Sequence, residues 1–198
     1  MKTRTVLTPD DWADAALLAA AEGGFGCISV EGLARRLEVS KGSFYWHFTG
    51  LEALLKAACA RWEAAGTDET IVALESIDDP KRRLEALFEV SVERLEHLKV
   101  EGAIAAAAAR GDRHARPVYA RVTRRRLEYV ETLYSKLGYA PGPARAWARL
   151  AFGAYLGTVQ LATIGLVANH ELGAHGRFLK GTLLPPAGPR RRSTRRTG

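Results

Sequence analysis

Residues 37–48 read LEVSKGSFYWHF, and this stretch decides how the rest of the chain is interpreted. Phe44 and Phe48 are four residues apart, so on a helix they share one face and are expected to be buried. Tyr45 and Trp46 then point away from that face, towards solvent. Because exposed apolar surface commonly marks an interaction site, the stretch predicts a short helix that binds a partner.

The residues just before the aromatic cluster suit a helix start that faces a charged backbone. Ser40 is a favourable N-cap residue, and Lys41, Gly42 and Ser43 would form the first turn. Small side chains let a partner approach closely, while free N–H groups and a lysine attract phosphate. The stretch therefore favours a partner that carries phosphate groups.

The same residues resemble the helix-turn-helix of TetR-type transcriptional regulators. Residues 29–34 (SVEGLA) resemble the second helix of that family, residues 40–48 its recognition helix, and residues 51–55 (LEALL) the start of its fourth helix. The resemblance covers about residues 6–66. Two positions differ from the family pattern: Glu38 stands at a turn position where the family usually has Gly, and Leu51 where it usually has a basic residue.

The resemblance implies a sequence-specific DNA-binding regulator, in this family usually a repressor. Lys41, Tyr45 and His47 are then expected to contact phosphates, and residues 42–43 to approach base edges. Arg35 and Arg36 lie on a more polar side of the preceding helix, where they form either a solvated face or further phosphate contacts. The full set of expected DNA-binding residues is Ser29, Arg35, Arg36, Ser40, Lys41, Gly42, Ser43, Tyr45, Trp46 and His47.

Charge by itself does not indicate a DNA-binding protein. The 198 residues carry a formal net charge of +7. Five arginines lie in the last nine residues, and residues 1–66 hold seven basic and eight acidic residues, a net charge of −1. The expectation of DNA binding therefore depends on where individual basic residues lie.

Composition indicates a globular chain of ordinary type, with 47% hydrophobic and 26% charged residues. Asp10 and Asp11 fall where a signal peptide would need its apolar segment, so we expect a cytoplasmic protein. Cys27 and Cys59 have no metal-binding spacing and are interpreted as reduced core thiols.

Helical periodicity recurs along the chain and no alternating strand pattern occurs, which predicts an all-α fold. Helix starts are expected at Thr8-Pro9, at Ser29 and at Asp79-Pro80, and a bend at Gly66. We expect three parts: a helix-turn-helix domain at 1–66 with its motif at about 30–49, a larger helical effector-binding and dimerisation domain at 67–184, and a disordered basic tail at 185–198. Longer helices are expected over about 51–77, 113–137, 150–168 and 171–184.

Residues 150–168 carry no charge and contain Gly153 and Gly157 in GxxxG spacing. A membrane span has this length, but polar residues dilute the apolar stripe and no second span occurs. A helix that is apolar all round can instead be buried against a second subunit. The resemblance implies the same, a homodimer on near-palindromic double-stranded DNA. The expected interface residues are Gly153, Gly157, Gln160, Leu161 and Ile164.

By resemblance, the larger domain encloses a pocket for a small-molecule effector, whose identity the sequence does not reveal. Aromatic residues are the candidates for its wall, although core packing is the alternative for each of them. These candidates are Tyr119, Tyr129, Trp147, Phe152 and Tyr155.

No motif indicates catalysis or a cofactor. His170, Glu171 and His175 resemble the zinc motif HExxH, but the second histidine is one residue too far along the helix. Glu93, His97 and Glu101 share a helix face, which more often is simply the wet side. We therefore expect no metal and no enzymatic activity. The alternatives are a dimeric helical adaptor without an effector and, less favoured, a metal-dependent enzyme.

Overall fold

The computed structural model describes residues 7–184; residues 1–6 and the predicted tail at 185–198 lie outside the described part. Within residues 7–184 the secondary structure is helical and includes no strand, which confirms the all-α prediction. The α-helices are α1 (Pro9–Gly23), α2 (Val30–Arg36), α3 (Lys41–Tyr45), α4 (Leu51–Glu63), α5 (Glu69–Glu75), α6 (Pro80–Ser91), α7 (Leu95–Ala109), α8 (Ala115–Lys136), α9 (Pro141–Thr163) and α10 (Leu172–Leu183).

Three helices begin where local capping chemistry predicted. At α1, the Thr8 hydroxyl accepts a hydrogen bond from the Asp11 backbone N–H, and the Asp11 carboxylate accepts one from the Thr8 N–H at 2.7 Å. That hydrogen bond lowers the pKa of Asp11. The Ser29 side chain caps α2 by accepting from the Gly32 N–H, and the Asp79 side chain caps α6 by accepting from the Lys81 N–H. Each cap satisfies backbone N–H groups that the helix leaves unpaired.

Two long helices are shorter than predicted. The helix expected over 51–77 is divided by a π-helical turn, Ala64–Asp68, which lies between α4 and α5 and includes Gly66. Such turns insert one residue into the hydrogen-bond ladder and bend the helix. The uncharged stretch 150–168 is helical only to Thr163, because Gly165 then adopts a left-handed φ of 76° that ends the helix.

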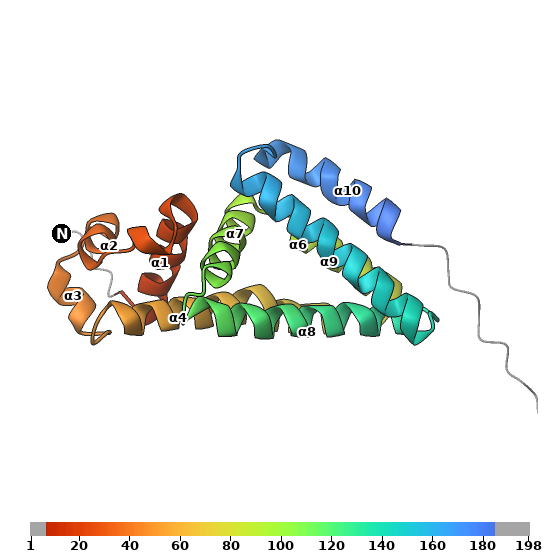
Figure 1. The fold of residues 1–198 in the computed structure, drawn as a ribbon, viewed down its shortest axis with the longest axis horizontal. Helices are drawn as coiled ribbons and strands as arrows, with labels where there is room; N and C mark the ends of the chain where they lie inside the picture. The colour runs from red at the N-terminus through yellow and green to blue at the C-terminus, as the bar shows by residue number, and fades with distance from the viewer. Residues whose placement is uncertain (1–6, 185–198) are drawn as a thin grey trace, which may run out of the picture.

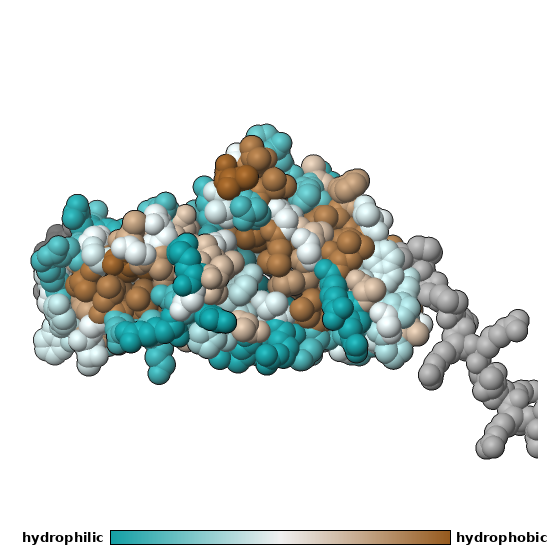
Figure 2. All heavy atoms as spheres, in the orientation of Figure 1, coloured by the Kyte–Doolittle hydropathy of each residue, from teal (hydrophilic) through white to brown (hydrophobic). Residues whose placement is uncertain are grey.

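The molecule is elongated, with α1, α2 and α3 at one end (Figure 1). Helix α8 runs along its base, and α7 and α9 enclose a triangle with it. Helix α4 runs beside α8 and connects the helices at that end to the rest of the chain (Figure 1). Helix α10 lies along the outer side of α9, and hydrophobic side chains are visible between α7 and α9 in Figure 2.

Helix α7, which is rich in alanine, packs closely against its neighbours. A Cβ at Gly102 would lie 2.1 Å from the Thr163 hydroxyl of α9, so any larger residue there would require Thr163 to move. Ile104 and Ala107 are buried in a core that also contains residues of α1, α3, α4 and α8. Because this core joins the N-terminal helices to α7 and α8, the proposed boundary near residue 66 stays a prediction.

The two cysteines differ in their surroundings. Cys59 is buried, and burial raises the pKa of its thiol to about 11, so it is an inert core thiol as expected. Cys27 is exposed, which corrects the prediction of a second core thiol. Its Sγ donates a hydrogen bond to the Gly23 carbonyl at the end of α1.

Candidate functional site

In and just after α3, the phenylalanines are buried and the other large aromatic side chains are exposed, as the sequence predicted. Phe44 is fully buried and packs edge-on against Trp12, with 5.4 Å between ring centroids. Phe48 stacks against Phe44 from just beyond the helix and is also buried. Tyr45 is 63% exposed and Trp46 is 87% exposed. The two phenylalanines therefore fix α3 to the core, and two large aromatic side chains are presented to solvent.

The start of α3 differs from expectation. Ser40 has an extended backbone at the N-cap position, but its side chain caps no N–H group. The helix also ends at Tyr45 rather than continuing to Phe48. With Ser40 and Gly42 exposed, the side chain and backbone at this end of α3 are accessible.

The turn between α2 and α3 keeps a left-handed residue without a glycine. Glu38 has a φ of 55° and is the only non-glycine residue with positive φ among the described residues. The Glu38 N–H donates to the Arg35 carbonyl, and the Val39 N–H donates to the Ala34 carbonyl at 2.9 Å. These two bonds close the end of α2. Left-handed backbone costs about 1–2 kcal/mol for an L-residue, so the turn holds Glu38 under strain.

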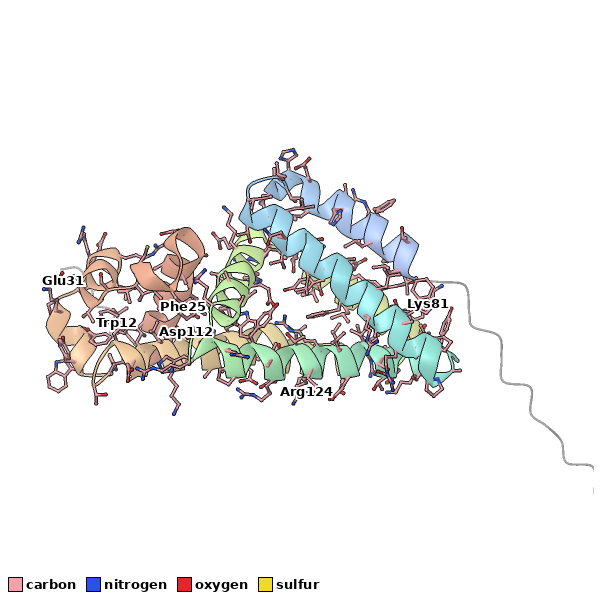
Figure 3. The ribbon with its side chains drawn as sticks, viewed as in Figure 1. Trp12, Phe25, Glu31, Lys81, Asp112 and Arg124 are labelled. Atoms are coloured by element: carbon pink, nitrogen blue, oxygen red, sulfur yellow. The ribbon has the colours of Figure 1, made fainter. Side chains whose placement is uncertain are left out.

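Acidic residues engage two of the three basic residues near α3. Arg36 makes a two-pronged ion pair with Glu22, at 2.7 and 2.8 Å. Lys41 pairs with Glu31, which lies at the outer end of the molecule (Figure 3). Arg35 is exposed and forms no ion pair with any residue of 7–184. The remaining expected DNA-binding residues lie here too: Ser29 is exposed, and Ser43 and His47 are half-buried.

A cavity of about 510 Å³ lies further along the molecule. Its wall includes residues of α1, α4, the π turn and α6 to α10. Of the five aromatic candidates, Tyr129, Phe152 and Tyr155 line it. Two do not, which corrects the sequence-based expectation. Tyr119 stacks on Trp62, and Trp147 stacks on Tyr134 in the core between α8 and α9.

An ion pair that the sequence analysis did not single out lies in the cavity wall. Arg126 Nη1 donates to Glu101 Oε2 at 2.9 Å, and only 2% of Glu101 is exposed. Arg126 also donates to the Thr67 hydroxyl at 2.9 Å and the Gly66 carbonyl at 3.1 Å. Although burial opposes its charge, Glu101 raises the pKa of Arg126. This one guanidinium therefore connects α7, α8 and the π turn after α4.

The spacing of α8 contains a signal for this residue. Val122, Arg126 and Val130 are four residues apart, and both valines are buried. The third arginine of the Arg124-Arg125-Arg126 run thus falls on the apolar face, whereas Arg124 points away from the body (Figure 3). An arginine on a buried face requires a partner. The helical spacing of Val122, Arg126 and Val130 was therefore a signal available in the sequence.

The expected interface residues are exposed on one side of α9. Gly153, Gly157 and Gln160 are exposed, as are Leu161 and Ile164. A Cβ at either glycine would meet nothing within 4 Å. On the adjoining α10, Phe178 is 69% exposed. The two helices therefore present a surface that is apolar and open within the single chain.

Two further findings concern other site types. Among residues 7–184, no helix combines the length and the hydrophobicity that a membrane span needs. In the same residues, no three His, Cys, Asp or Glu side chains are grouped so that they could hold a metal ion. His175, part of the HExxH-like stretch, contacts the Thr158 hydroxyl at 2.8 Å instead.

Comparisons with known proteins find a family for the N-terminal helices and similar folds for the whole chain. Residues 13–58 match the family described as "Bacterial regulatory proteins, tetR family". A transcriptional regulator from Rhodococcus sp. Rha1 has a similar structure, with 21% identity, a TM-score of 0.70, and 90% of this chain and 96% of that chain covered. A TetR transcriptional regulator from Legionella pneumophila shares 14% identity with a TM-score of 0.73, over 92% and 99% of the two chains.

A third similar structure is the fatty acid degradation regulator FadR from Bacillus halodurans, at 17% identity and a TM-score of 0.70 over 89% and 98% of the chains. No curated protein sequence matches the chain. Helices α2 and α3 pack against each other as the two helices of a helix-turn-helix. Residues 13–58 therefore carry the helix-turn-helix of the tetR family, and the chain as a whole shares the fold of these transcriptional regulators.

Proposed function

We propose that the protein is a homodimeric repressor that binds a near-palindromic DNA site and leaves it when a small molecule occupies the cavity. The observation that carries the proposal is the exposure of Tyr45 and Trp46 on a helix that Phe44 fixes to the core. Large side chains held rigidly at the surface can contact a DNA backbone with little loss of entropy. Arg35, Lys41 and the exposed backbone at Gly42 supply charge and close approach beside them.

The open face of α9 and α10 supports the dimer. It combines exposed Leu150, Leu161 and Ile164 with the small residues Gly153 and Gly157. Apolar patches of this kind on a soluble chain mark interaction sites. A two-fold axis there would pair the two α3 helices on half-sites about 34–36 Å apart.

The cavity supports the response to a ligand, because its wall crosses from the body to the N-terminal helices. Leu17 and Leu18 of α1 and Trp62 of α4 line it together with residues of α6 to α10. A ligand can shift a conformational equilibrium only if it contacts the two states differently. A molecule that contacts both the N-terminal helices and α6 to α10 makes different contacts in the two states if these helices move relative to one another. We also propose that the protein acts in the cytoplasm.

The runner-up is a dimeric helical adaptor without an effector, and no observation favours a metal-dependent enzyme. The cavity of about 510 Å³ favours the ligand-responsive protein over the adaptor. The test is selection of bound duplexes from a random pool by the full chain, with the Trp46→Ala variant as the comparison. The proposal predicts an enriched near-palindromic sequence that the variant binds more weakly. Enrichment of no sequence would contradict it.

A further inference from the structure

Two buried side-chain oxygens in the cavity wall have no hydrogen bond, Glu101 Oε1 and the Tyr129 hydroxyl, and only the first belongs to a carboxylate. Glu101 Oε2 accepts from Arg126, but Oε1 of the same carboxylate is buried and accepts none. A buried acceptor without a donor is costly, and the cost is greater for an ionised group. The position of Glu101 in the wall makes this oxygen a point where a bound molecule can contribute a donor.

The charges around Glu101 select against an anionic head group. The Arg126 guanidinium already donates to Glu101, Thr67 and Gly66. It also lies over the rings of Trp62 and Tyr155, at 5.2 and 6.0 Å from their centroids. Little of this cation is left for an incoming carboxylate, which would also face the charge on Glu101. A neutral hydroxyl meets no like charge there, and a protonated amine is attracted to Glu101 while its repulsion by Arg126 is reduced by the groups that already accept from that guanidinium.

The rest of the wall sets the other part of the ligand. It includes Leu17, Phe88, Val100 and Phe152, which are apolar. Sites with this composition bind molecules by their apolar surface and orient them by a few polar groups. Among the described residues, the wall thus combines apolar side chains with Glu101 Oε1, the one unpartnered oxygen there that belongs to a charged group.

We propose that the cavity binds an amphiphile with an apolar body and a hydrogen-bond donor head, a hydroxyl or a protonated amine, which donates to Glu101 Oε1. This inference rests on the proposed ligand response and names the chemical class of the ligand. The head group then lies beside the ion pair that holds the π turn after α4. Occupancy therefore acts on the residues that position α4, the helix that leads to α3.

The experiment uses three probes with the same chain and different heads: n-octanol, n-octylamine and n-octanoate. Binding to the full-length protein is measured at neutral pH by calorimetry and by the fluorescence of tryptophan, since Trp62 lines the cavity. A hydrogen bond to a charged group predicts that octanol and octylamine bind about tenfold or more tightly than octanoate. Equal or tighter binding of octanoate, or no binding of any probe, would overturn the inference.

A variant locates the effect at one atom. Glu101→Gln keeps the size of the side chain but removes its charge, so the advantage of octylamine over octanoate should disappear. Glu128→Gln, on the exposed side of α8, is the matched control and should leave the ranking unchanged. Thermal unfolding of both variants shows whether they fold, and the ranking in the unaltered chain stands independently of them.

Release of DNA is measured separately on a selected duplex. If the donor probes bind with the expected ranking but release no DNA, the ligand class stands and the proposed response fails. If octanoate alone binds and releases DNA, the response stands and the ligand class is wrong.

Discussion

Glu31 is predicted to compete with DNA for Lys41. The two side chains form an ion pair on the surface that carries α3, and both are more than half exposed. The hydrogen bond from Lys41, followed by its charge, lowers the pKa of Glu31, so the carboxylate stays ionised at neutral pH. Glu31→Gln removes this competitor and leaves Lys41 free to contact a phosphate.

The size of the effect follows from counterion release. Each phosphate contact changes the slope of log affinity against log salt by about −0.9, so one new contact in each half of a dimer adds about −1.8. Doubling the salt from about 0.1 M to about 0.2 M should then weaken the variant about 3.5-fold more than the unaltered protein. At the lower salt the variant should bind more tightly.

The assay is a fluorescence-anisotropy titration of a selected duplex at several salt concentrations. Glu131→Gln is the matched control, because it removes one charge from an exposed pair with Arg145 at the far end of α8. Its salt slope should equal that of the unaltered chain. Adding Lys41→Gln to Glu31→Gln should restore the original slope. An unchanged slope, or weaker binding by Glu31→Gln, would mean that Glu31 positions Lys41 rather than competing for it.

Three further predictions concern single residues. Trp46→Ala should change the free energy of unfolding by no more than about 0.5 kcal/mol yet weaken DNA binding. Phe44→Ala should lower the free energy of unfolding by about 3–5 kcal/mol. Equal losses of stability for the two variants in denaturant titrations would refute this contrast. Glu38→Gly should raise the free energy of unfolding by about 1 kcal/mol, because glycine adopts the left-handed backbone without strain. Glu38→Ala should give no such gain. An equal gain in both variants would show that backbone strain is not the cause. Gly157→Arg should give monomers in light scattering that bind DNA poorly, and a monomeric unaltered chain would reject the dimer.

The features predicted from sequence were those that neighbouring residues determine. The cap at Thr8 and the helix start at Asp79-Pro80 depend on residues within one turn, so their chemistry is visible in the sequence. The burial of Phe44 and the exposure of Trp46 follow from helical spacing. Ser40 shows the limit of this reasoning, because a suitable residue at an N-cap position formed no capping bond.

The cavity depends on residues that are distant in the chain. Glu101 and Arg126 lie 25 residues apart, and Arg126 and Gly66 lie 60 apart. The prediction from aromatic residues was right for Tyr129 and Tyr155, which line the cavity. It was wrong for Trp147, which packs in the core. Which aromatic residues face a cavity depends on how α8 and α9 are rotated against each other, and local sequence does not determine that rotation.

The central claim is that α3 reads a DNA sequence from a dimer. The most direct measurement is the affinity of the full chain for a selected duplex and for a scrambled duplex of equal length, at one fixed salt concentration and with the stoichiometry measured. The account predicts two chains per near-palindromic duplex and at least about 10³-fold tighter binding to the selected sequence. Equal affinities for the two duplexes would contradict it.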